Sequence, residues 1–434
     1  MHSVDSARAR RTTGLAILKR TGLVAALVLS SAAQLSARQA PDQTMPEFQI
    51  VESVPEASNY GEPGVPRTQA VWLQMIGSAK QSIDVAAFYI SDRPGSQLAP
   101  VIDAFIAKAK AGVKLRLLVD QTFLKDNQDS VMRLRSVDGI EVRELPVEKL
   151  TGGVLHAKYM VVDNSIVFMG SQNWDWRALD QIHEIGARIA NPRFARTFGA
   201  AFDFDWQVAG KPDLPKAAEQ ATKSLPFAPV TLSDPVILHG DGGAILTAFP
   251  AFSPPSLTPY ALTAEQPALV QMINQSQHTL RIQVMTLSAI RQYGPKGWWS
   301  EVDAALRDAA ARGVQVHIIV ADWALHEPMQ SYLKSLAVLP NVAIKFSQLP
   351  PSPQGFIPYA RVEHAKYAVT DDRSVYIGTG NWEWSYFNNT VDASIFVQGE
   401  APAKTLTHIF DQDWDGPYAK TLEVDKRYEA PRNH

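Results

Sequence analysis

Residues 155–173 read LHAKYMVVDNSIVFMGSQN, and residues 363–381 read EHAKYAVTDDRSVYIGTGN. The two stretches are copies of one pattern, because a His, a Lys, an Asp, a hydroxyl residue and an Asn fall at offsets 0, 2, 7, 15 and 17 in each. The first copy contains His156, Lys158, Asp163, Ser171 and Asn173, and the second contains His364, Lys366, Asp371, Thr379 and Asn381. One copy lies in each half of the chain, so the sequence predicts an internal duplication that kept its chemistry.

Each copy predicts a β-hairpin. The stretch HAKYMVVD is rich in apolar and β-branched residues, which is typical of a strand. Side chains two apart on a strand share a face, so the histidine and the lysine of one copy are expected to point the same way. A turn at 163–165 and a second strand, IVFMG, would then bring Ser171 and Asn173 back beside His156. The motif aspartates are predicted to be structural, anchoring the turns through backbone amides: Asp163 and Asp371.

Two such hairpins facing each other would surround one pocket with paired imidazole, ammonium, hydroxyl and carboxamide groups. The ammonium, amide and hydroxyl donors suit a tetrahedral phosphate, whose oxygens gain charge during substitution. A neutral imidazole can attack phosphorus, and a protonated one can donate to the departing oxygen. The pattern therefore predicts a phosphodiesterase centre, and it leaves open which histidine attacks. The predicted catalytic residues of the motifs are His156, Lys158, His364 and Lys366, and the predicted phosphate-binding residues are Asn173, Asn381, Ser171 and Thr379.

A carboxylate follows each histidine by 28 residues: Glu184 follows His156, and Asp392 follows His364. Each acid stands at the start of an apolar stretch. A carboxylate that accepts a hydrogen bond from the remote ring nitrogen fixes the tautomer and stabilises the imidazolium. We therefore predict a catalytic, orienting role for both acids. His183, beside Glu184, is expected to face away from it and to be exposed.

A zinc site is the main chemical rival, because histidine and acid often bind metal together. A lysine two residues from the histidine is a poor neighbour for a cation, and the chain has no cysteine. The prediction is therefore a centre with no metal and no cofactor. Aromatic residues that follow each motif have two interpretations, stacking on nucleobases or packing in the core: Trp174, Trp176, Trp382, Trp384, Tyr386 and Phe387.

The repeat continues outside the motifs. A helix-like run at 71–79 (VWLQMIGSA) precedes the strand SIDVAAFY, and its counterpart at 268–276 (ALVQMINQS) precedes TLRIQVMT. A further helix then leads to an apolar strand at 112–120 in the first half and at 313–322 in the second. Such strand–helix–strand units with apolar strands predict an α/β fold, here two α/β sandwich halves related by pseudo-twofold symmetry.

These motifs resemble those of the phospholipase D superfamily, and the resemblance covers nearly all of the chain after its leader. The runs GSQNWDWRALDQIHEIG, IPYARVEHAKYAVT and IGTGNWEWSYF look like the animal lysosomal branch, as do VESVPE near residue 51 and DWDGPY near residue 413. Members of that branch act as 5′-exonucleases on single-stranded DNA and RNA, and lipid transphosphatidylation has also been attributed to them. The resemblance implies the phospholipase D fold, with mixed β-sheets flanked by helices. It also implies a metal-independent, two-step reaction through a phosphohistidine, with His156 and His364 as nucleophile and acid.

The chain departs from that branch in two places. Gly380 stands where the branch usually has Ser or Ala, which removes a side chain beside the pocket and is expected to change substrate fit rather than the core chemistry. The chain also has no cysteine, whereas the animal members use disulfides.

The first forty residues have a different composition from the rest. Basic residues precede the apolar run LVAALVLSSAA, and small residues follow through Ala37. This is the pattern of a secretory signal with cleavage after Ala33 or Ala37, so we expect export to the periplasm or the extracellular space. The alternative is an uncleaved short anchor, but the run is shorter than the roughly 20 residues that span a bilayer, and no stable membrane span is predicted. An Ala-rich leader on a chain without cysteine favours a bacterial envelope protein.

The predicted domains are a signal peptide at 1–37, an N-terminal half at 45–225 with the first motif, and a C-terminal half at 236–425 with the second. Pro, Lys, Ala and Ser dominate the stretch 208–235 between the halves. The formal charge is −3, and it falls to about −7 without the leader, which carries five basic residues and one acid. A net acidic protein lacks the broad basic surface of a tight duplex binder. Whether the chain forms a homodimer stays open, since one chain already contains both motifs.

The sequence thus predicts a secreted phosphodiesterase that cleaves single-stranded nucleic acid from the 5′ end. The alternative is a phospholipase D that hydrolyses phospholipids or exchanges their head groups, although no obvious amphipathic membrane-docking helix accompanies the motifs. A third interpretation is an inactive phosphate-binding protein that inherited the fold. It is disfavoured because both histidines, both lysines and both carboxylates are present.

Overall fold

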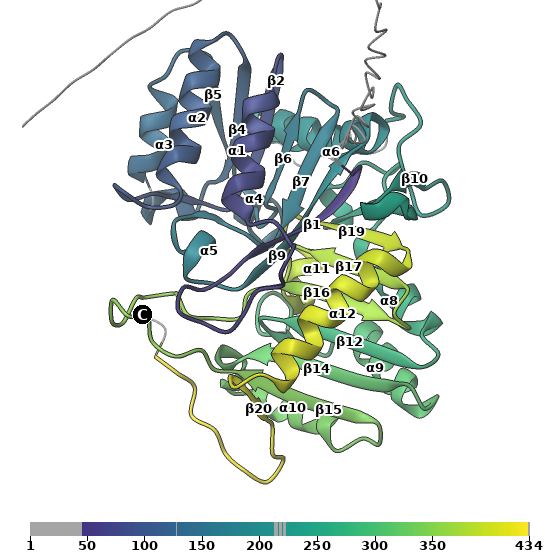
Figure 1. Ribbon diagram of the computed structural model, residues 1–434. Coiled ribbons are helices and arrows are strands. Elements are labelled where there is room, and N and C mark those ends of the chain that lie inside the picture. Colours follow the sequence, from purple (N-terminus) through teal and green to yellow (C-terminus); the bar gives the residue numbers. More distant parts are fainter. Residues whose placement is uncertain (1–45, 127, 212–215, 217–218, 220–222, 433–434) are drawn as a thin grey trace, which may run out of the picture. The chain divides into compact units, whose positions relative to one another are not determined.

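A chain whose halves repeat one order of helices and strands should form two similar sheets, and the computed structural model contains them (Figure 1). The structure describes residues 46–126, 128–211, 216, 219 and 223–432. The predicted signal peptide lies outside the described residues. From Pro46 onward the chain is one compact unit, in which strands of the two sheets contact each other directly.

The first half forms a seven-stranded sheet within the described residues, and its β2, β4 and β5 are parallel while the others are antiparallel. In spatial order its strands are β1 (Phe48–Ser53), β9 (Glu184–Ala190), β7 (Ile166–Gly170), β6 (Tyr159–Val162), β2 (Ser82–Ala87), β4 (Lys114–Asp120) and β5 (Ile140–Leu145). The strand β3 (Ile90–Ser91) pairs separately with β8 (Trp174–Asp175).

The second half repeats that order from β11 to β15 and adds one strand at each edge. Its strands are β10 (Val236–His239), β11 (Ile245–Ser253), β19 (Asp392–Gln398), β17 (Ser374–Gly378), β16 (Lys366–Thr370), β12 (Thr279–Val284), β14 (Gln315–Ala321), β15 (Val342–Ser347) and β20 (Ala419–Thr421). The strand β13 (Leu287–Ser288) pairs separately with β18 (Trp382–Glu383), as β3 does with β8. The predicted duplicated α/β fold with mixed sheets is confirmed.

Helices cover both sheets (Figure 1). The helices of eight residues or more are α1 (Thr68–Ser78), α2 (Ala99–Lys110), α3 (Gln128–Arg135), α6 (Pro192–Gly210), α8 (Glu265–Gln275), α9 (Ser300–Ala311), α10 (Met329–Ala337) and α12 (Glu400–Asp415). Shorter helices are α4 (Val147–Thr151), α5 (Arg177–Asp180) and α11 (Trp384–Asn388), with 3₁₀ turns at Phe123–Asp126, Asp241–Gly243, Pro255–Leu257 and Asp322–Leu325. Of the stretch predicted to separate the halves, residues 208–210 are the end of α6, and β10 begins directly after residue 235.

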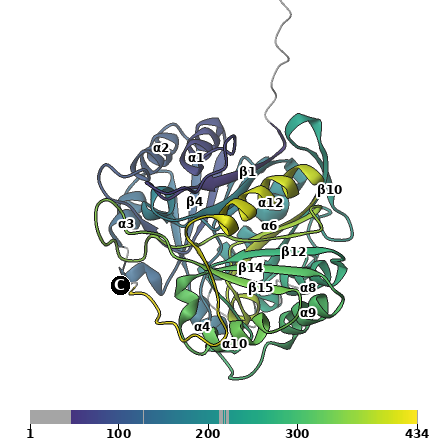
Figure 2. The same cartoon turned by 60° about the horizontal axis from the view of Figure 1, so that its bottom comes forward.

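One large core cluster joins the two halves. It contains residues of β6, β7 and β9 from the first sheet and of β16, β17 and β19 from the second, together with the apolar faces of α6 and α12. The helix α12 contacts β1 of the first half as well as β12 and β16 of the second, and Figure 2 shows it between them. Because the halves share this core, their facing edges have a fixed separation, which the site below requires.

The two motif hairpins are built as predicted, but their aspartates anchor a neighbouring segment. Tyr159 pairs with Met169 in β6 and β7, and the turn residue Asp163 has a left-handed φ of 51°. Its carboxylate accepts the N–H groups of Lys80, Gln81 and Ser82, each at 2.8 Å. Asp371, with φ 52°, does the same for the backbone of residues 277–279. The carboxylates thus hold the entries into β2 and β12, whereas the sequence predicted that they would anchor their own turns.

None of the helices in the described part of the chain combines the length and the apolar character that a bilayer crossing needs.

Candidate active site

Both motif histidines lie just before a strand, whereas the sequence predicted them inside it. The strand β6 begins only at Tyr159, and the N–H of His156 donates to the carbonyl oxygen of Val391 at 2.8 Å. In the second half, the N–H of His364 donates to the carbonyl oxygen of His183 at 3.0 Å. Each histidine leaves its own sheet because its backbone bonds to the other half of the chain.

The predicted orienting acids pair with the histidines across the halves. His156 Nδ1 lies 3.0 Å from Oδ1 of Asp392, and His364 Nδ1 lies 2.7 Å from Oε2 of Glu184. The equal offset of 28 residues identified the acids but not this crossing. With Nδ1 bound to a carboxylate, Nε2 of each ring is the nitrogen left for a substrate. Neither half alone therefore contains a complete histidine–acid pair.

The two motif lysines are fully buried beside the histidines. Nζ of Lys158 donates to the carbonyl oxygen of His156, and Nζ of Lys366 donates to that of His364, both at 2.5 Å. Burial lowers the pKa of Lys158 well below its usual range and that of Lys366 to about 7, against the pull of nearby carboxylates. An anion in the site would favour the charged form of both, so the lysines are suited to bind a phosphate.

Burial also sets the protonation of the histidine–acid pairs. It lowers the pKa of His156 and of His364 well below the usual value, and the charges of the two lysines act in the same direction. It raises the pKa of Glu184 and of Asp392 well above the usual value, although the lysines oppose this. Without a bound anion these shifts favour unprotonated imidazole, the nucleophilic form, whereas an anionic phosphate favours the protonated ring that a general acid needs.

Both histidines open onto one cavity of about 630 Å³. The predicted phosphate-binding amides line it as well, and Oδ1 of Asn173 and of Asn381 is buried without a partner among the described residues. Each amide therefore has bonding capacity left for a ligand. The full lining is Phe88, Tyr89, Ser91, Phe123, His156, Asn173, Arg177, Ile182, Met285, Trp323, Tyr359, Val362, His364, Asn381 and Tyr386.

The motif hydroxyls lie behind the acids instead of facing the cavity, which differs from their predicted role as phosphate ligands. Thr379 Oγ1 donates to Oδ1 of Asp392 at 2.6 Å. Ser171 Oγ donates to the carbonyl oxygen of Ile185 at 3.2 Å and accepts its N–H at 3.1 Å. Thr379 stands next to β19 and Ser171 next to β9, the strands that carry the acids. Their hydroxyls therefore form hydrogen bonds with residues of those strands.

Two aromatic rings flank His156, and the sequence pattern indicates only one of them, Tyr386. The Phe88 ring lies 4.9 Å from the imidazole centroid and the Tyr386 ring 5.0 Å from it, in an edge contact. Tyr386 Oη accepts a hydrogen bond from Nδ2 of Asn381 at 3.1 Å. Phe88 ends the apolar run after β2 without any motif, so only its position after the strand could have indicated it. In the first half, Ala178 stands where the repeat has Tyr386, so this ring of the aromatic wall has no counterpart in the repeat.

Arg177 is a cation at the cavity that the motif pattern does not contain. Asp175 holds its guanidinium, with Nη2 2.6 Å from Oδ2, and Tyr89 donates to the same carboxylate at 2.8 Å. Its Nη1 donates to the carbonyl oxygen of Pro358, at the end of a proline-rich loop.

The aromatic residues that follow the motifs fall into two groups, core residues and residues at or near the cavity. Trp174, Trp382 and Phe387 are core residues, whereas Tyr386 reaches the cavity and Trp176 and Trp384 are half-buried.

His183 is fully buried, so the expectation that it would be exposed is wrong. It faces Glu363 and Asp413, and these three side chains are the one group in the described residues whose spacing could suit a metal ion. The group lies outside the cavity and contains neither motif histidine. The predicted catalytic pairs are therefore separate from it.

Comparison with known proteins agrees with this geometry. The family model described as cardiolipin synthase, PLD-like domain, matches residues 72–206 and 269–414, one stretch in each half. The chain is 32% identical over 419 residues to the 5'-3' exonuclease PLD3 of Bos taurus, covering 89% of this chain and 83% of that protein. It is 33% identical over 391 residues to phospholipase D Z of Dictyostelium discoideum, covering 86% and 90%.

Among solved structures, the phosphatidylserine synthase of Haemophilus influenzae Rd KW20 superposes with a TM-score of 0.60 at 12% sequence identity. The match covers 88% of this chain and 89% of that one. At this identity the likeness is one of fold.

Proposed function

This chain is a phosphodiesterase hydrolase of the phospholipase D superfamily, and on that basis we propose that it cleaves single-stranded nucleic acid from the 5′ end without a metal ion. The observation that carries the proposal is the pair of histidine–carboxylate contacts, each made between the two halves, with both rings on one cavity. Two imidazoles at one phosphate supply a nucleophile and a general acid together.

The proposed reaction has two steps. In the first, the neutral Nε2 of one histidine attacks phosphorus, a P–N bond forms, and the P–O bond to the leaving group breaks as the other histidine donates a proton to that oxygen. In the second, the other histidine takes a proton from water, the water oxygen attacks phosphorus, and the P–N bond breaks. Lys158, Lys366, Asn173 and Asn381 stabilise the charge that develops on the non-bridging oxygens.

Three observations favour a single-stranded substrate taken from one end. The relatives named 5'-3' exonuclease align over most of the chain. Aromatic rings lie beside His156, where they can stack on an unpaired base. The chain is net acidic, so its cationic groups for a polyanion are those of the cavity, which suits a chain end better than a long duplex.

The second candidate substrate is a phospholipid. The observation that favours it is the similarity to a protein named phospholipase D Z, over 86% of this chain. The same two-step chemistry would hydrolyse the head group, or transfer the phosphatidyl group to an alcohol instead of water.

The test is a substrate panel in EDTA. We expect EDTA-resistant cleavage of a single-stranded oligonucleotide that has a free 5′ end, and much slower cleavage of the same strand with a blocked 5′ end or in a duplex. Choline release from phosphatidylcholine, or transfer to an added primary alcohol, would select the lipid candidate. Loss of all activity in EDTA would contradict the metal-independent reaction.

We also propose that the chain is exported by its basic and apolar leader, to a periplasmic or extracellular site. Its source in a bacterial envelope and the formation of a homodimer stay predictions. N-terminal sequencing of protein recovered from the cell exterior tests the export, with cleavage expected after Ala33 or Ala37. Recovery of the uncleaved chain in membranes would favour the short anchor.

A further inference from the structure

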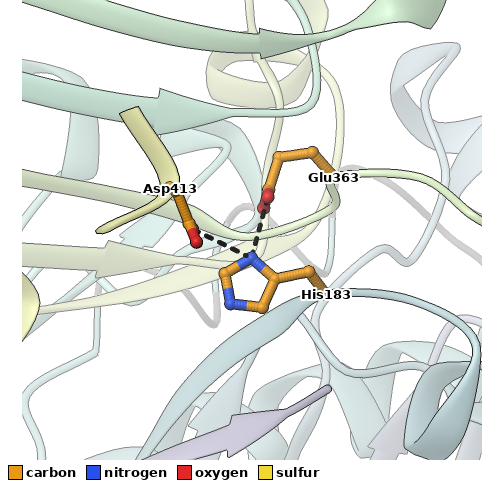
Figure 3. A group of neighbouring side chains, drawn as sticks. All are labelled: His183, Glu363 and Asp413. Atoms are coloured by element: carbon orange, nitrogen blue, oxygen red, sulfur yellow. Dashed lines mark hydrogen bonds and ion pairs between the residues drawn. The ribbon is translucent and has the colours of Figure 1, made fainter. Parts of the chain in front are cut away.

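A second histidine–carboxylate pair lies directly behind His364. The segments 182–184 and 362–364 run parallel, because His183 donates its N–H to the carbonyl oxygen of Val362 at 3.2 Å and accepts the N–H of His364 at 3.0 Å. Side chains alternate along such extended backbone, so the crossing has two faces. Glu184 and His364 form the cavity pair, and His183 and Glu363 form a rear pair with Nδ1 2.8 Å from Oε2 (Figure 3). The same four backbone positions therefore hold both pairs.

The rear ring is surrounded by carboxylates. Besides Glu363 at Nδ1, Glu52 Oε1 lies 3.2 Å from Nε2, and Oδ2 of Asp413 lies 3.6 Å from Nδ1, as Figure 3 shows for Glu363 and Asp413. A neutral imidazole has only one N–H, and here each ring nitrogen faces an acceptor, so the geometry calls for the doubly protonated ring. Although burial opposes the charge, Glu363 and Asp413 raise the pKa of His183 well above its usual value.

Neighbouring residues bind the three carboxylates that surround His183. Glu52 forms an ion pair with Arg67 and accepts the N–H of Glu62, and Glu363 accepts the N–H of Ala365. Asp413 accepts from Nε2 of Gln283 at 2.8 Å, and Gln283 in turn accepts from the hydroxyl of Tyr367 at 2.7 Å. The Tyr60 ring covers the imidazole at 4.6 Å between centroids, and its hydroxyl bonds to Ser347. Each of the three acids thus keeps a second protein partner besides the ring.

The equivalent crossing in the other half has an apolar rear pair. There His156 donates its N–H to the carbonyl oxygen of Val391, and Val391 donates its own to that of Val154. The bridge partners are Leu155 and Val391, at the places that Glu363 and His183 occupy in the repeat. The pseudo-symmetry of the site is therefore broken immediately behind the histidines, with an ion pair behind His364 and two apolar side chains behind His156.

We propose that His183, held as an imidazolium by Glu363, is a positioning residue for the His364–Glu184 pair, and that the two catalytic pairs are for this reason not equivalent. The inference rests on the proposed phosphodiesterase function. His183 and Glu363 flank the catalytic residues along the chain, so their ion pair fixes the register at which the Glu184 carboxylate meets the His364 ring. A small error in that register misplaces the reacting nitrogen, to which the rate is sensitive.

A bound cation is the competing explanation of the rear cluster. Nδ1 of His183, Oε2 of Glu363 and Oδ2 of Asp413 lie close enough to surround one. A metal ion would need the ring nitrogen without its proton, whereas both ring nitrogens point at carboxylates. The two explanations differ in what the purified protein contains, so the test includes a metal analysis.

The first measurement is the kinetics of His183→Gln, Glu363→Gln and the double variant on bis(p-nitrophenyl) phosphate in EDTA. We expect kcat to fall about tenfold in each single variant, with KM little changed. The pH dependence of kcat should shift because the Glu184 carboxylate is no longer held in register with the His364 ring. The kcat of the double variant should be no lower than that of the less active single variant, since the two residues act as a unit. Wild-type kcat and pH dependence in all three variants would overturn the proposal.

The matched control is Asp84→Asn, which breaks a partly buried ion pair elsewhere in the fold. Asp84 lies in β2, is 3% exposed and binds Arg116 at 2.7 and 2.8 Å, with no contact to the cavity. We expect it to lower the melting temperature and to leave the pH dependence of kcat unchanged. If Asp84→Asn shifts that pH dependence as the His183 variant does, the effect is general loss of stability, and the positioning role fails.

A readout without turnover separates this inference from the proposed function. In ¹⁵N-histidine-labelled wild-type protein at neutral pH, both ring nitrogens of His183 should carry protons, and His183→Gln should shift the Nδ1 proton of His364 but not that of His156. A singly protonated His183, or one equivalent of metal that His183→Gln removes, would overturn the inference. Wild-type protein without phosphodiesterase activity would instead overturn the proposed function, while the spectra still test the positioning.

Discussion

At His156 and His364 the protein opposes protonation twice, through burial and through the neighbouring ammonium groups. The Lys366 ammonium is itself destabilised by burial, with a pKa of about 7. The histidines and lysines of the site therefore lose their protons at a lower pH than the same side chains in water. This has a measurable consequence for the rate.

The pH dependence of kcat/KM should show both effects. Histidine is nucleophilic above its pKa, so lowered histidine pKa values place the acid limb below the ordinary 6.5. A lysine is charged below its pKa, so the phosphate clamp is present below about 7 and is lost as the pH rises through that value. In kcat the basic limb should lie at higher pH, because bound phosphate favours the ammonium form. A kcat/KM that stays constant from pH 6 to about pH 9 would contradict this.

Replacing either histidine tests whether both serve one centre. We expect His156→Asn and His364→Asn each to lower kcat by about 10³-fold, because one removes the nucleophile and the other the acid. Circular dichroism and melting temperature should remain close to those of the wild type. Rapid quenching with mass spectrometry then identifies the attacking residue, since a phosphohistidine accumulates only on the nucleophile. Full activity in either variant would exclude the shared centre.

Gly380 makes room for the aromatic wall. A Cβ at this position would lie 3.2 Å from Cβ of Tyr386 and 3.3 Å from Cγ of Asp392. Both neighbours contact His156, so Gly380→Ala is expected to lower kcat/KM by about tenfold through their displacement. The matched control is Gly77→Ala, on an exposed helix position with open space, which should stabilise the fold by about 0.5–1 kcal/mol and leave the rate unchanged. Wild-type kcat/KM in Gly380→Ala would show that the close contact has no effect.

At the scale of elements, the two motif hairpins could be predicted because their strands and turns are local in the sequence. The spacing of HAKYMVVD and IVFMG predicted two antiparallel strands and a turn, and the structure has them at β6 and β7. What the pattern missed is where the first strand begins, because His156 bonds to the backbone of Val391, 235 positions away. A contact of that separation leaves no periodicity in the local sequence.

The anchoring aspartates give an element-level prediction. Asp163 accepts three backbone N–H groups ahead of β2, and three amide donors lower its pKa despite partial burial. Asp163→Ala should destabilise the protein by about 2–3 kcal/mol in urea unfolding, because those donors lose a charged acceptor and the left-handed turn loses a favourable residue. Asp163→Asn should cost less. Asp371→Ala should lower the free energy of unfolding by a similar amount, because the second half has the same aspartate anchor. A negligible change in both variants would contradict the anchoring role.

Over the whole molecule, the sequence allowed the residues of the site to be named but not their arrangement. Both histidines, both lysines and both acids stand at repeated offsets, and repetition is visible in a single chain. The burial of His183 is not predictable from its neighbours in the sequence, Ile182 and Glu184, because they show nothing of Glu52 or Asp413. Tyr386 was ambiguous because packing and stacking use the same side chain. The surroundings of His183 and Tyr386 depend on contacts between residues far apart in the chain, which a single sequence does not show.

The crossed pairing is the feature that makes the two halves one enzyme, and it can be tested directly. If Asp392 holds His156 and Glu184 holds His364, then Asp392→Asn must alter the ring ¹⁵N signals of His156 and leave those of His364 unchanged. Glu184→Gln must do the reverse. The amides keep the shape of the acids but not their charge, so the affected ring loses the charged acceptor that stabilises its Nδ1 proton. Each substitution should also lower kcat by about 10²-fold. The opposite pattern, in which each acid controls the histidine of its own half, would mean that the halves do not share their catalytic pairs.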